Sequence, residues 1–449
     1  MNTPIVDFVK KYTKEENLRL HMPGHKGKNF LGCEKWDITE IEGADVLYKA
    51  NGIIKQSEEN AASLFGTAKT LYSTEGSSLS IRAMLYLLKL YAAKNGEKPL
   101  IFAARNAHKT FVTAAALLDF DVFWLCPQKE SSLISCDINA DYIEECLNKS
   151  AQKPVAVYLT SPDYLGNILD IAKISKICKK YGILLLVDNA HGAYLNFLPE
   201  NIHPINLGAD MCCDSAHKTL PVLTGGAYLH ISDSAPELFS QMAESAMALF
   251  ASTSPSYLIL QSLDMANKYL SENYCERLAN FIGELEELKS KLADFGFLLF
   301  GKEPLKLTIA PKSYGYTGEE LAKILSKKGI ICEFSDPDFI VFMFTEGIKS
   351  EDLAKLETEL LKIERRTKIE ITPPALPTVK KRLSLNEAIM LPSKTVEIGK
   401  SVGKIAADSA ITCPPAIPIV VCGEEITHES VKCFEYYKIT TCAVIDKEI

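Results

Sequence analysis

Short apolar runs alternate with segments of helical periodicity between about residues 51 and 230. Six runs have the length and composition of strands: Leu100–Ala103, Val122–Leu125, Val155–Thr160, Ile183–Val187, Met211–Cys213 and Ala227–Ile231. Helical stretches such as Ser78–Ala93 and Ala172–Lys180 lie between them. Strands that alternate with helices predict an α/β fold whose mostly parallel sheet is covered by helices on both faces.

The pattern changes after this region. Apolar residues recur at helical spacing over about 275–295, and Gly296 follows the last of them. Short predicted strands and helices then continue to about residue 370, which indicates a small α+β domain. Pro373-Pro374-Ala375-Leu376-Pro377 is typical of a linker. We therefore expect an N-terminal segment over 1–50, a large domain over 51–272, a small domain over 273–370 and a C-terminal domain over 371–449.

Composition and charge narrow the class of protein. The 449 residues are 47% hydrophobic and 24% charged, which is ordinary for a globular protein. The net charge of −8 argues against nucleic-acid binding, which usually needs a basic surface. No apolar run approaches the ~20 residues of a membrane span, and the N-terminus lacks the regions of a signal peptide.

The thirteen cysteines form no recognisable framework. Cys212 and Cys213 are adjacent, the others are widely spaced, and the sequence contains no C-x-x-C. Metal-binding and disulfide-rich folds need tighter patterns, so we expect no metal site. Free thiols in a reducing compartment are the simplest interpretation, which predicts a cytoplasmic protein.

Lys218 and Asp188 carry the first chemical signal. Asp188 ends the apolar run Ile183–Val187, and Lys218 follows just beyond the run Met211–Cys213. Enzymes that use pyridoxal 5′-phosphate (PLP) hold it as a Schiff base with a lysine and keep its pyridine nitrogen protonated with a carboxylate. Either residue alone is more often a surface lysine or a strand-end acid, so the prediction depends on their surroundings.

A candidate phosphate site precedes the helix that begins near Leu79. The segment Thr74-Glu75-Gly76-Ser77-Ser78 leads into this helix, whose N-terminus offers unpaired backbone N–H groups and a positive dipole. Gly76 allows close approach of the backbone, and the Ser77 and Ser78 hydroxyls add donors. A serine in this position is commonly just a helix cap. The sequence contains neither G-x-G-x-x-G nor a Walker loop, so nucleotide-binding interpretations lack support.

Three polar side chains are expected at one edge of the sheet. His108, Asp188 and Ser215 each follow a predicted strand, and ligands of open α/β sheets bind beyond the carboxyl ends of the strands. His108 could stack on a planar ring, although a helix-start histidine is the commoner structural interpretation. Ser215 and His217 would reach a cofactor phosphate, and His191 would lie over the ring or contact the substrate. The order of these elements matches the aspartate-aminotransferase-like class (fold type I).

The whole chain resembles the Orn/Lys/Arg decarboxylase family, in the short form that lacks an N-terminal wing domain. The resemblance rests on four segments: His21-Met22-Pro23-Gly24-His25-Lys26-Gly27; Asp37-Ile38-Thr39-Glu40-Ile41 and Leu64-Phe65-Gly66 leading into Glu75-Gly76-Ser77-Ser78; Ser215-Ala216-His217-Lys218-Thr219-Leu220-Pro221; and Pro414-Pro415-Ala416-Ile417-Pro418 with Gly423-Glu424. They occur in the family's order over nearly the whole chain. S-x-H-K alone is a weak pattern, but the four segments together are specific.

The resemblance implies a role for each candidate residue. Lys218 would bind PLP, Asp188 would pair with its pyridine nitrogen and His108 would stack on its ring. The residues implied around the phosphate are Ser77, Ser78, Ser215 and His217. Lys218 or a nearby histidine would return a proton to the substrate's α-carbon. The resemblance also implies a homodimer or larger homo-oligomer with active sites at the subunit interface, where Thr253 would reach a neighbouring subunit's phosphate.

Four residues depart from the usual family pattern. Cys413 and Ala416 stand where Tyr and Gly are common, Asp163 replaces a more usual Thr, and Glu75 replaces a frequent Asn. None of them belongs to the core cofactor set. Because Cys413 and Ala416 fall in the C-terminal signature, substrate preference is the property most open to change.

The expected reaction is decarboxylation of a basic L-amino acid for polyamine metabolism. The resemblance to the short form favours arginine, which gives agmatine, over lysine and then ornithine. A cationic side chain needs a carboxylate in the pocket, because an unpaired buried charge is costly. Glu424 is the first candidate, with Glu425 and Asp45 behind it, although each is as readily a solvated acid.

Two other interpretations stay open. Another fold-type-I activity, such as an aminotransferase or a carbon–carbon lyase, would share Lys218 and Asp188. An aminotransferase typically grips the α-carboxylate with an arginine, and none of Arg365, Arg366 and Arg382 lies in a recognisable context for it. A catalytically silent homologue that regulates a partner is less favoured, because the lysine, aspartate and histidine are all intact.

Overall fold

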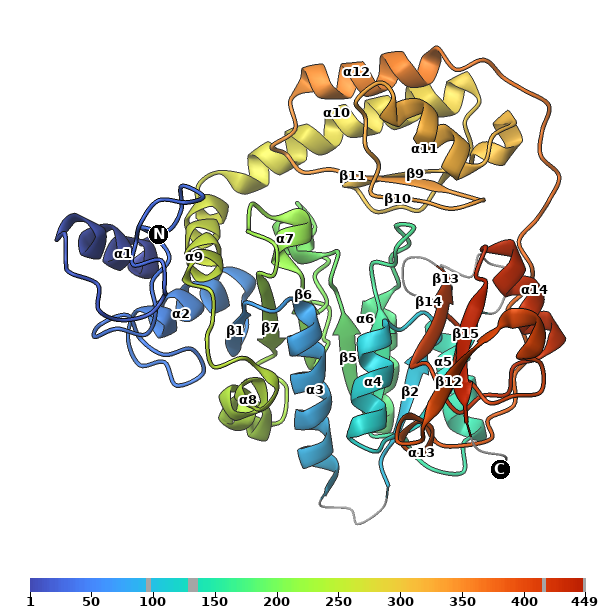
Figure 1. Ribbon diagram of the computed structural model, residues 1–449, viewed down its shortest axis with the longest axis horizontal. Coiled ribbons are helices and arrows are strands. Elements are labelled where there is room, and N and C mark those ends of the chain that lie inside the picture. The colour runs from blue at the N-terminus through green and yellow to red at the C-terminus, as the bar shows by residue number, and fades with distance from the viewer. Residues whose placement is uncertain (94–97, 128–135, 414–416, 447–449) are drawn as a thin grey trace. The chain divides into compact units, whose positions relative to one another are not determined.

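The computed structural model describes residues 1–93, 98–127, 136–413 and 417–446 (Figure 1). The chain divides into two compact units, Met1–Gly96 with Ile171–Glu276 and Glu97–Asp170 with Arg277–Ile449. Each unit combines segments that are distant in sequence, so the two units are not the domains expected along the chain. The boundaries of those domains stay a prediction.

Four strands form the sheet of the first unit in the order β1-β7-β6-β5. They are β1 (Lys69–Ser73), β5 (Leu184–Asp188), β6 (Met211–Asp214) and β7 (Ala227–Ile231). β5 and β6 run parallel, whereas β7 pairs antiparallel with both β6 and β1. Every residue of β5 and β7 is buried, which is why both sequences are continuous apolar runs rather than alternating ones.

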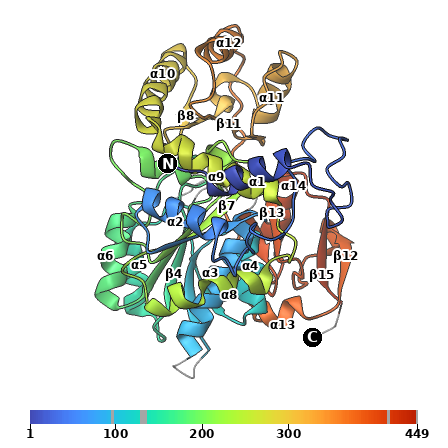
Figure 2. The same ribbon diagram turned by 90° about the vertical axis from the view of Figure 1, so that its left-hand side faces the viewer.

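Helices surround this sheet within the first unit. They are α1 (Pro4–Lys14), α2 (Ile53–Phe65), α3 (Ser77–Ala92), α6 (Ile171–Tyr181), α7 (Ala216–Thr219), α8 (Glu237–Phe250) and α9 (Tyr257–Ser271), with a 3-10 turn at Ala193–Phe197. α3 packs against α8, and α1, α2 and α9 pack against one another (Figure 2). α3 is buried over most of its circumference, and Leu79, Met84 and Leu88 are fully buried.

The second unit begins with three parallel strands in the order β4-β2-β3. These are β2 (Leu100–Ala104), β3 (Asp121–Leu125) and β4 (Ala156–Thr160), connected through α4 (Lys109–Leu117) and α5 (Ala140–Lys149). A strand–helix–strand connection between parallel strands is the arrangement that the alternating pattern predicts.

A small α+β layer follows α10 (Tyr274–Phe295). α10 buries one apolar stripe that includes Leu278, Leu285 and Leu292, and it ends at Gly296, whose φ of 111° only glycine adopts readily. The antiparallel sheet has the order β10-β11-β9-β8. Its elements are β8 (Leu299–Phe300), β9 (Lys306–Ile309), a 3-10 turn at Pro311–Tyr314, α11 (Gly318–Ser326), β10 (Phe334–Ser335), β11 (Ile340–Met343) and α12 (Ser350–Leu361).

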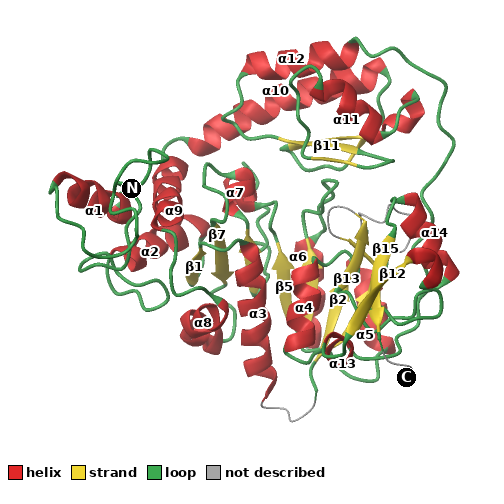
Figure 3. Ribbon diagram, in the orientation of Figure 1, coloured by secondary structure: helices red, strands yellow, loops and turns green. Residues whose placement is uncertain are grey.

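The C-terminal segment contains two antiparallel strand pairs and two helices (Figure 3). Its elements are α13 (Leu385–Ile389), β12 (Ser393–Glu397), a 3-10 turn at Ile398–Lys400, β13 (Ala410–Cys413), β14 (Ile417–Val421), α14 (His428–Tyr436) and β15 (Thr441–Ile445). Phe434 and Val444 share a buried cluster with Phe339 and Val341 of the small α+β layer. The signature residues Pro414, Pro415 and Ala416 lie outside the described residues.

The structure confirms the predicted α/β class and all six predicted strands, with ends that differ by at most one residue. The sequence pattern missed β1 and α2, and it gave no sign that β7 runs antiparallel. Among the described cysteines, all are free thiols, and seven of them are buried: Cys136, Cys178, Cys212, Cys213, Cys422, Cys433 and Cys442. None of the described helices combines the length and the apolar character that crossing a bilayer requires.

Candidate active site

Asp188 is the last residue of β5 and is only 2% exposed. Its Oδ1 accepts hydrogen bonds from Ala190 N at 3.2 Å and from Cys213 Sγ at 3.6 Å. Burial, together with the nearby Asp188 carboxylate, raises the pKa of the Cys213 thiol well above its ordinary value, so this thiol stays a neutral donor. The Asp188 carboxylate is thus buried and held in a fixed orientation at the carboxyl end of β5.

Lys218 lies in α7, one turn beyond the end of β6. Its Nζ lies 3.1 Å from Nε2 of His191, which follows Asp188 by three residues. His191 is buried and Lys218 is half-buried. Within the first unit, Asp188 ends β5, His191 follows it by three residues, and Lys218 follows the adjacent parallel strand β6.

The predicted phosphate loop joins β1 to α3. Gly76 has a φ of 72°, and its N–H donates to Gly225 O at 2.7 Å, which fixes the turn. A Cβ built on Gly76 would find only Ser78 N, at 4.0 Å. The space over the first backbone N–H groups of α3 is thus open to a ligand, as an anion site at a helix N-terminus requires.

Ser215 connects the phosphate loop to the lysine turn. Its Oγ donates to Ser77 Oγ at 2.9 Å, although the two residues are 138 positions apart. Ser77 is the first residue of α3, and Ser215 immediately precedes α7. Both hydroxyls therefore lie where one phosphate group could contact them.

His217 is anchored to the same region. Its Nδ1 donates to Gly226 O at 2.9 Å. Burial lowers the pKa of His217, the Gly226 carbonyl opposes that effect, and the Lys218 ammonium lowers the pKa further. With Nδ1–H already donating, a neutral His217 has an acceptor at Nε2, so it would donate to a phosphate only when protonated.

Thr253 lies in the connection between α8 and α9 and is exposed. The preceding residue, Ser252, donates its N–H to Glu75 Oε1 at 2.7 Å. Glu75 is the residue that departs from the family pattern in the phosphate loop, and this bond gives it a function of its own: it ties the loop that carries Thr253 to the phosphate loop. The predicted role of Thr253 toward a neighbouring subunit stays a prediction.

His108 belongs to the second unit, where it caps the N-terminus of α4. Its Nδ1 accepts a hydrogen bond from Thr110 N at 3.2 Å and lies 2.9 Å from Thr110 Oγ1. An acceptor at Nδ1 assigns the proton of the neutral ring to Nε2. The imidazole is therefore fixed in both position and tautomer, which is what a ring-stacking residue needs.

Glu424 was predicted to bind the substrate's cationic group, but in the structure its partner is Arg105. Glu424 is 5% exposed, and its two oxygens accept hydrogen bonds from Arg105 Nη1 at 2.7 Å and Nη2 at 2.8 Å. Val421 N also donates to Oε2 at 2.8 Å. A carboxylate that is neutralised by an internal guanidinium has no charge left over for a substrate cation.

The two other candidate carboxylates for the substrate cation, Glu425 and Asp45, also have internal partners. Glu425 forms an ion pair with Arg382, whose Nη2 lies 2.6 Å from Oε2. Asp45 accepts hydrogen bonds from Gly52 N at 2.8 Å and Ile54 N at 3.0 Å, at the start of α2. Partial burial raises the pKa of Asp45, but its backbone donors outweigh this and hold it below the ordinary value.

A buried network around Asp214, the last residue of β6, was not predicted from the sequence. Asp214 Oδ2 lies 3.0 Å from His203 Nε2 and 3.3 Å from His230 Nε2, and Oδ1 accepts from Asn189 Nδ2 at 2.7 Å. All three side chains of the His–Asp–His group are fully buried. Burial raises the pKa of Asp214, but the two histidines outweigh it and bring the pKa well below its usual range.

The His–Asp–His group consists of metal-ligand types, and both imidazoles lie within 3.3 Å of the Asp214 carboxylate. We interpret it as an internal network that fixes the end of β6 directly before Ser215. The sequence signal was only Asp214 itself, because His203 and His230 lie outside the motif and nothing local connects them to it.

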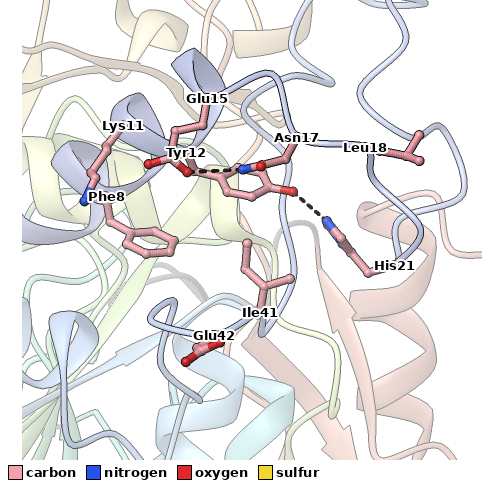
Figure 4. Close-up of a pocket in the computed structure, with 9 residues that line it drawn as sticks. All are labelled: Phe8, Lys11, Tyr12, Glu15, Asn17, Leu18, His21, Ile41 and Glu42. Carbon is pink, nitrogen blue, oxygen red and sulfur yellow. Dashed lines mark hydrogen bonds between the residues drawn. The ribbon is translucent and has the colours of Figure 1, made fainter.

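The N-terminal motif forms a separate feature of the first unit. His21 lines a hollow of about 470 Å³ between α1 and the following loop, and its Nε2 lies 2.6 Å from Tyr12 Oη (Figure 4). His25 Nε2 lies 3.2 Å from Asp37 Oδ2, which joins the first two segments of the family resemblance. None of Lys218, Asp188 and His191 is among the residues that line this hollow.

The candidate residues of the first unit fit PLP. The open helix N-terminus with its two serines suits the phosphate, Asp188 suits a protonated ring nitrogen, and Lys218 suits the carbonyl carbon. The described part of the chain thus contains suitable residues for the phosphate, the ring nitrogen and the carbonyl carbon of this cofactor.

Comparisons with known proteins point to one family. The family model for the Orn/Lys/Arg decarboxylase major domain matches residues 3–296, and the model for the C-terminal domain of the same family matches residues 371–445. An uncharacterized protein of Bacillus subtilis is 30% identical over 466 residues, which covers 96% of this chain and 93% of that protein. The arginine decarboxylase of Bacillus subtilis is 27% identical and covers 96% of this chain and 92% of its own length.

Solved structures support the fold. The lysine decarboxylase of Francisella novicida superposes with a TM-score of 0.81 at 18% identity, over 99% of this chain and 81% of that one. The matching family models span most of the chain, and the fold is that of fold-type-I enzymes. The chain belongs to the Orn/Lys/Arg decarboxylase family of PLP-dependent carboxy-lyases.

Proposed function

We propose that this protein decarboxylates a basic L-amino acid, with L-arginine as the preferred substrate and agmatine as the product. The observation that carries the proposal is the 3.1 Å distance between Lys218 Nζ, in the turn after β6, and His191 Nε2, three residues after Asp188 at the end of the adjacent parallel strand β5. The preference for arginine rests on the full-length similarity to proteins named arginine decarboxylase. Lysine and ornithine are the alternatives.

The proposed site residues divide into four groups by the part of PLP that they would contact. Lys218 would bind it covalently, and Asp188 would pair with the pyridine nitrogen. The residues proposed around the phosphate are Gly76, Ser77, Ser78, Ser215 and His217, with Thr253 from a neighbouring subunit. His108 would stack on the ring, and His191 would lie over the ring or contact the substrate. The assignments of His108 and Thr253 rest on the family resemblance.

Bound PLP supplies an electron sink for the bond that breaks at the substrate's α-carbon. The chain's residues supply the remaining steps. Asp188 would hold the ring nitrogen protonated, and its burial would keep competing water away. Lys218 and His191 lie within hydrogen-bonding distance, so a proton can pass between Nζ and Nε2 and be delivered to the α-carbon after carbon dioxide leaves.

The carboxylate that binds the substrate's distal cation is unassigned in this proposal. Glu424, Glu425 and Asp45 are each occupied by an internal partner. We propose a homodimer or larger homo-oligomer that acts in the cytoplasm, with residues of a second subunit completing the site.

The decisive experiment incubates the PLP-loaded protein separately with L-arginine, L-lysine and L-ornithine and measures both carbon dioxide and the amine. One preferred substrate, and loss of both products in Lys218→Ala, is the expected result. A keto acid in place of the amine would identify an aminotransferase. If the protein shows the absorption band of bound PLP but forms no product from any of the three amino acids, the proposed decarboxylation is wrong although the protein binds PLP.

A further inference from the structure

A buried ion pair joins the C-terminal segment to the end of β2. Glu424 and Arg105 are 319 positions apart, and their side chains are only 7% and 5% exposed. Two parallel hydrogen bonds connect them, and Arg105 Nη2 also donates to Ile419 O at 3.1 Å. Burial lowers the pKa of Arg105, but the Glu424 carboxylate outweighs burial and raises it, so the guanidinium is charged.

Stability alone does not explain such a pair. Taking two charges out of water costs about as much free energy as their attraction returns, and well-packed apolar residues commonly do as well. A bidentate pair does, however, fix a planar guanidinium in one orientation. The stacking of Arg105 against Trp124, at 5.1 Å from the ring centroid, fixes it further.

The fixed arginine begins the turn that carries His108. Arg105 N donates to Leu125 O at 2.9 Å, and Ala107 N closes the turn on Ala104 O at 3.0 Å. His108 follows at once as the N-cap of α4. Arg105 is therefore the second residue of the turn 104–107, and His108 is the first residue after it.

The C-terminal segment also holds the far end of α4. α13 packs against α4, and Asn386 Nδ2 donates to Ala116 O at 2.9 Å, in the last turn of the helix. The helix capped by His108 is thus held at its start through Glu424 and Arg105 and near its end through Asn386. All of these contacts lie within the second unit.

From these contacts we infer that Glu424 is a positioning residue, which acts through Arg105 to set the place and orientation of the His108 ring. The inference rests on the proposed function, because it takes His108 to be the residue that stacks on PLP. It gives the C-terminal domain a part in catalysis that needs no contact with the substrate.

The test replaces Glu424 with glutamine, which preserves its shape and removes its charge. We expect the visible circular dichroism of bound PLP to change, the affinity of the apoprotein for PLP to fall, and kcat to fall about tenfold to a hundredfold. The KM for the amino acid should stay within about twofold of its original value, since Glu424 does not touch the substrate in this inference. Glu425→Gln is the matched control, because its partner Arg382 is half exposed, and it should change none of these quantities.

A second comparison separates positioning from general damage. In a His108→Ala background, Glu424→Gln should have little further effect on the cofactor signal or on kcat, because its effect passes through His108. Equal losses in both backgrounds would overturn the inference. Arg105→Lys keeps the positive charge and loses the bidentate geometry, so it should reproduce the change in the cofactor signal and serves as the second variant if Glu424→Gln does not fold.

Other outcomes have distinct meanings. A raised KM with an unchanged PLP signal in Glu424→Gln would make Glu424 a substrate-binding residue and overturn its positioning role. If the unaltered protein binds PLP but decarboxylates none of the three amino acids, the proposed function fails, yet the circular dichroism comparison still decides whether Glu424 positions His108.

Discussion

At the scale of single residues, Gly76 shows how one backbone conformation prepares a binding site. It combines a φ of 72° with a ψ of 177°, a region that residues with a Cβ seldom enter. No neighbouring side chain would block a methyl group there, so glycine is needed for its conformation rather than for its small size. The same turn aims the first N–H groups of α3 at the open space where we place the phosphate.

We therefore predict that Gly76→Ala weakens PLP binding by roughly tenfold or more, because the turn must relax away from its present conformation. Titration of the apoprotein with PLP measures the effect. Gly283→Ala is the control: Gly283 lies inside α10 with no atom within 4 Å of the added Cβ, and alanine there should leave PLP affinity unchanged and raise stability slightly. Equal affinities in Gly76→Ala and the unaltered protein would contradict the assigned phosphate site.

At the scale of elements, Glu58 connects α2 to β1. Its side chain is buried, and Oε1 accepts the backbone N–H of Tyr72 at 2.9 Å. Burial is the main cause that raises the pKa of Glu58 to about 8, from an ordinary value of 4.5. The folded protein therefore keeps this carboxyl protonated at pH values where the unfolded chain ionises it.

This difference predicts a pH dependence of stability with a definite sign. Between the unfolded and folded pKa values the folded state binds the extra proton, so the free energy of unfolding falls as pH rises from about 4.5 to about 8. Glu58→Gln cannot ionise and retains a carbonyl acceptor for Tyr72 N. Its stability should fall less over this range, as measured by urea unfolding at several pH values. The exposed neighbour Glu59→Gln should show the original pH dependence, and an identical slope in Glu58→Gln would refute the argument.

At the scale of the whole molecule, the N-terminal segment exposes an unusual number of large apolar side chains. Leu18, Leu20, Phe30 and Leu31 are 76–89% exposed, within fourteen residues of sequence. Exposed apolar groups that cluster in this way mark protein interaction sites more often than solvent-facing surface. A second copy of the chain is the partner that the proposed oligomer requires.

We predict that the unaltered protein sediments at the mass of at least two chains, and that the double substitution Leu20→Asp with Leu31→Asp shifts it toward the mass of one chain. A charge placed in an apolar contact must be desolvated when the subunits associate, which weakens that contact. Decarboxylase activity should fall with dissociation if Thr253 completes the neighbouring site. Ile331→Asp, at a position that is 78% exposed in the second unit, is the control. An unchanged sedimentation mass in the double variant would exclude this segment from the interface.

Much of the fold was encoded locally. The run Ile183–Val187 predicted a buried strand, and Asp188 at its end and Lys218 beyond the next strand indicated the cofactor chemistry from the sequence alone. These predictions depend on periodicity and on residues close in sequence, which need only one strand or one turn to be recognised. The antiparallel direction of β7 was not predictable in this way, because apolar content is the same for either direction.

Only the tertiary structure decided which distant side chains meet. The sequence offered Glu424 as the carboxylate for a substrate's distal cation, and folding placed it against Arg105, 319 positions away. It likewise brought His203 and His230 to Asp214 and joined Ser77 to Ser215. The physical reason is that a charge or a hydroxyl has the same local signature whether it ends in solvent, in a pocket or in an internal pair, and only the packing of the surrounding chain selects among them.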